Sequence, residues 1–358
     1  MSSLRASLPE LESLEALLSE LPGARTRTLT VVRLARQALP VHAVLLGGED
    51  KTLPALLFVG GVHGLERVGT QVLLSYLRSL RAALSWDELL LHMLRRIRLM
   101  FVPLVNPAGM ALGLRSNARG VDLMRNSPVR AEHGSRWFEL HRGQRLTRYL
   151  PWYQGTPELG MEAESRALCG FVERELFQSR CAIIVDVHSS FLPGDRLWFP
   201  YARSREPFGH TPEVLALAEL LGRTHEGHVY EVEPQSLNYT THGDLWDHVY
   251  DRFRQHRGSG VLLPLTLELS SRPWYGKNPR QLVRKLGLFH PMKAHRLARV
   301  QRRHKTLFDF LARAVLSHER WLPEGAEERA RLLREAHQRW FSADPGATSP
   351  RAMSVCAR

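Results

Sequence analysis

The residues of this chain best suited to metal chemistry begin with a histidine and a glutamate three positions apart, His63 and Glu66. They follow the apolar run 56–59 and a pair of glycines, and apolar residues beyond Glu66 recur at helical spacing. The motif therefore lies where a buried strand gives way to a helix, a usual position for a site in an α/β sheet. An imidazole and a carboxylate spaced in this way can bind the same zinc ion.

Two further residues complete a candidate zinc site. His188 also ends an apolar strand, so it can lie at the same sheet edge as His63. Two histidines and Glu66 are three protein ligands, which leave one coordination position open, as in catalytic zinc sites. Glu268 stands between two leucines near the end of another apolar strand, where burial raises the pKa of a carboxyl group toward that of a useful general base. Each residue alone is more often structural, but together they predict a hydrolase with one zinc ion per chain.

The segments that must position these residues alternate between strands and helices, which favours an α/β domain over residues 25–290. Besides the strand before His63, we expect strands at 28–34, 41–46, 97–105, 181–187, 228–232 and 261–269. We expect helices from after Glu66 to about residue 83, and at 161–177, 212–221 and 244–253. The stretch 110–160 shows little periodicity, and a loop of this length in a compact domain is usually functional.

The two ends of the chain have different patterns. Residues 1–24 predict an amphipathic N-terminal helix, since leucines recur along one face. Residues 291–342 predict a helical C-terminal extension, with a second helix over about 324–341. The segment 343–358 has no core-forming pattern and is expected to be disordered.

The composition is that of a soluble globular protein, with 44% hydrophobic and 24% charged residues. We expect no membrane association, because no apolar run reaches the roughly 18 residues of a membrane span. Three cysteines in no metal-like spacing, and an N-terminus unlike a secretory signal, predict a cytoplasmic protein. The net charge of +13 fits either an anionic partner or a solvated arginine-rich surface. We favour the second and expect no nucleic-acid partner.

Five segments, taken in order, resemble motifs of the zinc carboxypeptidase family. They are GVHGLE (61–66), NPAG (106–109), NARGVDLMRN (117–126), DVHS (186–189) and TLEL (266–269). The resemblance implies a three-layer α/β/α sandwich around a mixed, about eight-stranded sheet. It also implies a zinc ion held by His63, Glu66 and His188, with Glu268 acting as general base and general acid.

The resemblance also implies roles for residues between the metal-binding motifs. Asp122 matches a carboxylate that orients the first histidine ligand. Arg115 matches an arginine that stabilises the oxyanion, and Arg125 matches the arginine that binds the terminal carboxylate of the substrate. Met124 departs from the family, which usually has asparagine there, and a thioether cannot donate a hydrogen bond.

Substrate-side residues are assigned by a looser alignment. Tyr239 is the nearest counterpart of the family's mobile tyrosine, and Asp244 falls where an acidic residue selects basic side chains. Arg119 joins Arg115 and Arg125 in one segment, so the site should have a positive potential. We therefore predict a peptide or N-acyl amino acid substrate with a free carboxylate beside the scissile amide.

The leading hypothesis is a cytoplasmic zinc carboxypeptidase or peptide amidase, and two alternatives stand beside it. A deacylase of N-acyl amino acids, similar to aspartoacylase and succinylglutamate desuccinylase, would share the fold and the His-x-x-Glu motif. Met124 keeps this alternative open, whereas segments 117–123 and 266–269 favour the carboxypeptidase. A basic binding protein on an inactive scaffold is the other alternative, and the presence of every metal ligand and of the base argues against it.

Overall fold

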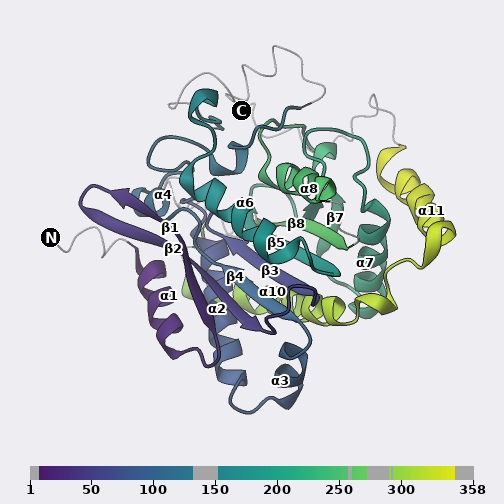
Figure 1. The fold of residues 1–358 in the computed structure, drawn as a ribbon, viewed down its shortest axis with the longest axis horizontal. Coiled ribbons are helices and arrows are strands. Elements are labelled where there is room, and N and C mark those ends of the chain that lie inside the picture. The colour runs from purple at the N-terminus through teal and green to yellow at the C-terminus, as the bar shows by residue number, and fades with distance from the viewer. Residues whose placement is uncertain (1–7, 132–151, 257–259, 272–289, 292, 343–358) are drawn as a thin grey trace.

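A mixed sheet of eight strands organises the protein (Figure 1). The computed structural model describes residues 8–131, 152–256, 260–271, 290–291 and 293–342. The strands are β1 (Arg25–Leu34), β2 (Gln37–Gly47), β3 (Ala55–Gly60), β4 (Arg98–Val102), β5 (Cys181–Ser190), β6 (Asp195–Phe199), β7 (Tyr230–Pro234) and β8 (Val261–Ser270). Their order is β1-β2-β4-β3-β5-β8-β6-β7. The central strands β4, β3, β5 and β8 are parallel, whereas β2 and β6 run antiparallel to their central neighbours.

Helices cover both faces of this sheet. They are α1 (Pro9–Glu20), α2 (Arg67–Ala83), α3 (Glu88–Leu94), α4 (Pro107–Leu112), α6 (Ala163–Leu176), α7 (Thr211–Thr224), α8 (Leu245–Gln255), α10 (Ala294–Leu316) and α11 (Gly325–Ala336). Helices α2 and α10 pack against each other and against β3 and β5, while α6 and α8 contact each other and strands β1 and β8. The predicted α/β/α sandwich with a helical C-terminal region is confirmed.

The central strands form because their sequences are almost entirely apolar. Strands β3, β4 and β5 are buried along nearly their whole length, as expected for parallel strands covered on both faces. Helix α2 presents its apolar stripe to this core, including Val68, Val72 and Leu73. The polar residues that follow these strands are consequently held at one edge of a rigid sheet.

Among the described strands and α-helices, three were not predicted from the sequence: β6, α3 and α4. Strand β6 has five residues and begins with Asp195 and Arg196, so it lacks a clear apolar pattern. Helix α3 lies between the expected helix that ends near residue 83 and the expected strand at 97–105, and the Asp87 carboxylate caps it by accepting from Leu89 N and Leu90 N. Helix α4 begins within the NPAG segment, because the Asn106 side chain caps its N-terminus.

Both ends of the described chain pack against the sheet domain. Helix α1 places Leu14 and Leu17 in the main core. At the other end, α11 and the π-helical turn η7 (His337–Phe341) lie beside α7 and β7, and the Trp340 indole donates to Val232 O at 3.0 Å. Within the described ranges, no helix is long and apolar enough to cross a membrane. The predicted disordered tail, 343–358, lies outside the described residues.

Candidate active site

The loop between β3 and α2 is tied to the start of α4. The Asn106 amide donates to Val62 O at 3.1 Å, and its Oδ1 accepts from Gly109 N at 2.8 Å. Gly64 permits this contact, since a Cβ at that position would lie 2.1 Å from the Gly109 carbonyl carbon. The NPAG and GVHGLE segments thus build one rigid corner, which fixes the direction of His63.

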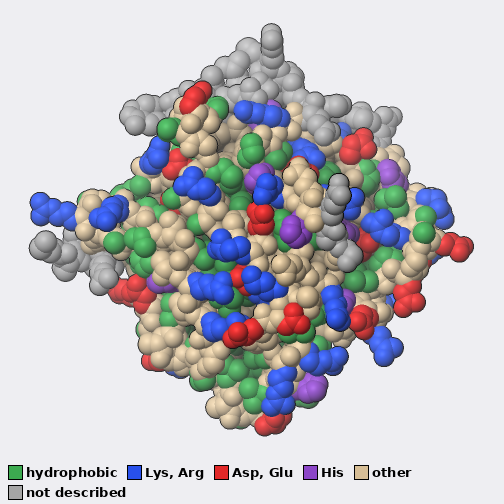
Figure 2. All heavy atoms as spheres, viewed as in Figure 1, with side chains coloured by type: hydrophobic (Ala, Val, Ile, Leu, Met, Phe, Trp, Pro, Cys, Tyr) green, Lys and Arg blue, Asp and Glu red, His purple; other side chains and the backbone are tan. Residues whose placement is uncertain are grey.

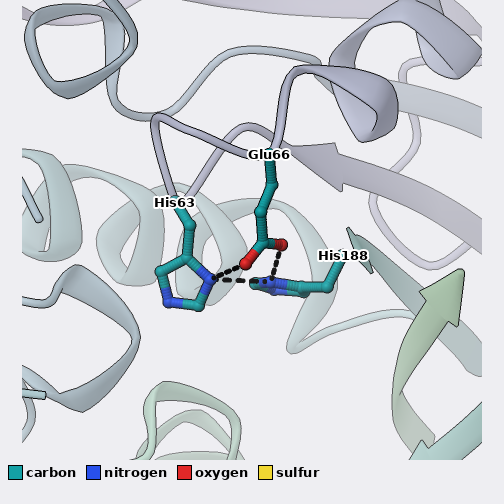
Figure 3. A group of neighbouring side chains, drawn as sticks. All are labelled: His63, Glu66 and His188. Atoms are coloured by element: carbon teal, nitrogen blue, oxygen red, sulfur yellow. Dashed lines mark hydrogen bonds and ion pairs between the residues drawn. The ribbon is translucent and has the colours of Figure 1, made fainter. Parts of the chain in front are cut away.

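Three buried side chains converge near the carboxyl ends of β3 and β5: His63, Glu66 and His188 (Figure 3). His63 Nδ1 lies 2.9 Å from Glu66 Oε1 and 3.1 Å from His188 Nδ1. His188 Nδ1 is also 3.2 Å from Glu66 Oε2. Two imidazole nitrogens and a carboxylate that face one another, with all ligand atoms within 4.8 Å, fit a zinc ion bound by three protein ligands.

A buried aspartate holds the outer ring nitrogen of each histidine. His63 Nε2 lies 3.1 Å from Asp122 Oδ1, and His188 Nε2 lies 2.8 Å from Asp186 Oδ2. Such contacts favour a proton on Nε2 and leave Nδ1 as the metal-facing nitrogen. The role of Asp186 was missed from the sequence, although its position two residues before His188 places both on one strand face.

Arg115 bridges two carboxylates: that of Glu66, which faces the two histidines, and that of Asp122, which contacts His63. Its Nε donates to Asp122 Oδ2 at 2.9 Å, and its Nη1 donates to Glu66 Oε1 at 3.3 Å. Burial alone would raise the pKa of both carboxyl groups. However, Arg115 and His63 lower the pKa of Asp122 below its usual range, and His63 and His188 lower that of Glu66. Both groups are therefore ionised at neutral pH.

Glu268 stands beside this cluster on β8. Its Cα is the register partner of His188, so the two side chains share one face of the sheet. Burial raises the pKa of Glu268, and the charge of Glu66 raises it further, against the lowering influence of His188. Among the described residues, Glu268 Oε2 has no hydrogen-bond partner. A carboxylate with an unengaged oxygen and a raised pKa is suited to proton transfer.

The structure also brings together Arg125, Tyr239 and Asp244. Arg125 Nη1 donates to Asp244 Oδ2 at 3.1 Å, and its Nη2 donates to Tyr239 Oη at 3.3 Å. The other oxygen of Asp244 accepts from the first backbone N–H groups of α8. Both oxygens of Asp244 are thus engaged inside the protein, and its side chain is nearly fully buried.

Two other residues of the predicted site lie outside these groups. The Arg119 side chain is 61% exposed, and its Nε lies 3.6 Å from a Glu162 carboxylate oxygen. Met124 packs into the main hydrophobic core and is only 4% exposed. The position where the family usually has asparagine is therefore a core position in this chain.

Several solved structures are similar to this fold. A crystal structure of thrombin activatable fibrinolysis inhibitor superposes with a TM-score of 0.63 at 19% identity, over 86% of this chain and 74% of that one. The bovine inhibitor, in complex with tick carboxypeptidase inhibitor, gives 0.61 at 18% identity, over 87% and 97%. A Pseudomonas aeruginosa metallo-carboxypeptidase, in complex with (2-guanidinoethylmercapto)succinic acid, gives 0.53 at 17%, over 85% and 67%. At these identities the comparison establishes the fold.

Sequence similarity identifies the family. Residues 24–281 match the family model described as zinc carboxypeptidase, so this chain belongs to that family of metallohydrolases. Carboxypeptidase SOL1 of Arabidopsis thaliana is 35% identical over 81 residues. That match covers 23% of this chain and 16% of the plant protein.

Proposed function

We propose that this protein hydrolyses an amide bond next to a free carboxylate, as a zinc carboxypeptidase or peptide amidase. The observation that carries the proposal is the placement of Glu268 beside the cluster of His63, Glu66 and His188, across one pair of parallel strands. The three clustered residues would hold one zinc ion per chain. When bound, zinc supplies a Lewis acid that polarises the substrate carbonyl and makes water more acidic.

The remaining steps belong to side chains of this chain. Glu268 accepts a proton from the attacking water and delivers it to the leaving amine, for which its raised pKa is favourable. Arg115, held by Asp122, extends Nη1 toward the cluster and stabilises negative charge on the carbonyl oxygen. Asp122 and Asp186 keep the two histidines oriented.

Arg125 is the proposed anchor for the substrate carboxylate, with Tyr239 beside it. A guanidinium group suits this role because its planar donors match a carboxylate. The contacts of Asp244 favour positioning of Arg125 over the predicted selection of basic side chains, since both of its oxygens are already engaged. A substrate contact of the exposed Arg119 remains a prediction.

A deacylase of N-acyl amino acids is the less favoured function, because the matching family model is that of zinc carboxypeptidases. On the face shown in Figure 2, arginine and lysine side chains lie among carboxylates, which supports a solvated basic surface over a nucleic-acid partner. A cytoplasmic location is supported by the two described cysteines, Cys169 and Cys181. Both are free thiols, and burial raises the pKa of each to about 12.

The test is a direct assay on purified protein with its zinc content quantified. The substrates are a peptide with a free C-terminus, the same peptide as its C-terminal amide, and a set of N-acyl amino acids. We expect cleavage of the free peptide and little cleavage of its amide. Equal cleavage of the two peptides would refute the carboxylate requirement, and cleavage of N-acyl amino acids alone would favour the deacylase.

A further inference from the structure

One carboxylate oxygen on the edge strand β7 accepts hydrogen bonds from three side chains. Glu233 Oε1 accepts from Arg196 Nη1, from Trp198 Nε1 at 3.0 Å and from Asn238 Nδ2 at 2.8 Å. Trp198 is the register partner of Glu233 on β6, and Arg196 lies two residues earlier on the same face. The Glu233 side chain is only 12% exposed. Hydrogen bonds to a partly buried charged group are among the stronger ones in proteins.

These contacts connect β7 to the proposed active site through β6. Arg196 is the register partner of Glu268 on β8, and Trp198 is the partner of Thr266. Moving outward from the metal ligands, the same sheet face thus carries His188, then Glu268, then Arg196. Glu233 therefore holds the strand that stands directly beside the proposed base.

The third donor, Asn238, connects Glu233 to the segment that carries Tyr239. Asn238 ends the short 3₁₀ helix η4 (Gln235–Leu237) and immediately precedes Tyr239. The Tyr239 ring meets the Trp198 ring edge to face, with centroids 6.1 Å apart and planes at 87°. The hydroxyl of the same tyrosine accepts from Arg125. Two of the three donors to Glu233 thus adjoin Tyr239: Asn238 precedes it in the chain, and Trp198 contacts its ring.

We propose that Glu233 is a positioning residue for substrate binding. By holding Asn238 and Trp198 on one oxygen, it keeps segment 235–239 against β6 and keeps Tyr239 within reach of Arg125. This inference rests on the proposed function, because it assigns the Tyr239–Arg125 contact to the binding of the substrate carboxylate. Glu233 itself touches neither the substrate nor the metal ligands.

The chain offers a matched control in Glu231. It lies two residues before Glu233 on the same face of β7, and its Oε2 pairs with Arg196 Nη2 at 3.1 Å. Among the described residues this is its one ion pair, and its side chain is 61% exposed. Glu231→Ala therefore removes an Arg196 contact from β7 and leaves the hydrogen bonds to Trp198 and Asn238 in place.

The experiment compares Glu233→Ala, Glu233→Gln and Glu231→Ala in the full chain by two measurements. Amide hydrogen exchange over residues 235–241 should accelerate in Glu233→Ala alone. The KM for a peptide with a free C-terminus should rise about tenfold in that variant, as expected for the loss of an ordered polar contact. Its kcat, and kcat/KM for the C-terminal amide, should stay near the wild-type values. Glu233→Gln keeps an acceptor oxygen, so its KM for the peptide with a free C-terminus should stay close to the wild-type value.

Three results would overturn the proposal: unchanged exchange and KM in Glu233→Ala, an equal effect of Glu231→Ala, or a proportional loss of activity on both peptides. The last result would mean that Glu233 supports the fold in general. If the wild-type protein cleaves no peptide at all, the proposed function fails. The exchange comparison would still decide whether Glu233 holds segment 235–239.

Discussion

His188 and Glu268 are register partners on the adjacent parallel strands β5 and β8, so a proposed metal ligand and the proposed base stand side by side on one face of the sheet. The Cα atoms of these two residues cannot change their pairing without a shift of strand register. Such a shift would move every neighbouring apolar side chain to the opposite face. The core of the protein therefore maintains the geometry of the site.

Replacing the proposed base should separate catalysis from metal binding. Glu268→Gln keeps the shape of the side chain and removes its basicity, so kcat should fall roughly 10²–10⁴-fold while zinc content is unchanged. Peptide hydrolysis and metal analysis of the same preparation would check both expectations. Thr266→Ser, two residues earlier on the same face of β8, is the control and should retain most activity. Turnover near the wild-type value in Glu268→Gln would rule out the role.

The aspartates behind the histidines should matter for zinc affinity. Asp122→Asn and Asp186→Asn each weaken the contact that orients a ligand, and loss of such contacts typically costs 10–100-fold in metal affinity. Competition with a chromophoric chelator would measure the change. Asp186 also accepts from the Trp246 indole at 2.9 Å, so Trp246→Phe removes that bond, keeps an aromatic ring in the core and should leave zinc affinity unchanged. A similar loss in Trp246→Phe would assign the effect to packing.

Two arginines should affect different kinetic constants. Arg125→Ala should raise KM for a free-carboxylate peptide by roughly 10–150-fold, because a charge-assisted hydrogen bond is lost. Arg115→Ala should mainly lower kcat, by roughly 10²–10³-fold, as expected for a donor to the developing oxyanion. Arg130→Ala is the control substitution, because Arg130 is exposed and donates to Gln154. The same change in KM and kcat for Arg115→Ala and Arg125→Ala would contradict the division of roles.

Acid should destabilise the fold through buried neutral histidines. Burial lowers the pKa of His304 to about 4, against the raising influence of Asp195, and lowers that of His210 to about 3. Between pH 6.5 and 4 the unfolded chain binds protons that these folded histidines do not, so the free energy of unfolding should fall as the pH falls through this window. For His304 the loss is on the order of 3 kcal/mol.

Urea unfolding at several pH values would measure this dependence. His304→Leu removes one titrating group and should flatten the fall between pH 6.5 and 4, whatever its effect on absolute stability. His92 is exposed, and His92→Gln should leave the slope unchanged. An unaltered slope in His304→Leu would contradict the prediction.

The sequence by itself determined the residues of the proposed metal site and the elements that end near them. His63 and Glu66 share one turn between a strand and a helix, and His188 and Glu268 lie toward the ends of apolar strands. Such features depend on neighbours a few positions apart, which periodicity and turn residues can indicate. The same local rules predicted most helices and strands, with boundaries shifted by a few residues.

Only the tertiary structure decided which of these segments meet. The insertion of β6 between β8 and β7 and the pairing of Arg125 with Asp244 depend on strand order and on chain segments up to 119 residues apart. Strand order is selected by the packing of whole faces, and no short window of sequence records it. The placement of Met124 in the core and of Glu233 beside Trp198 follows from that packing.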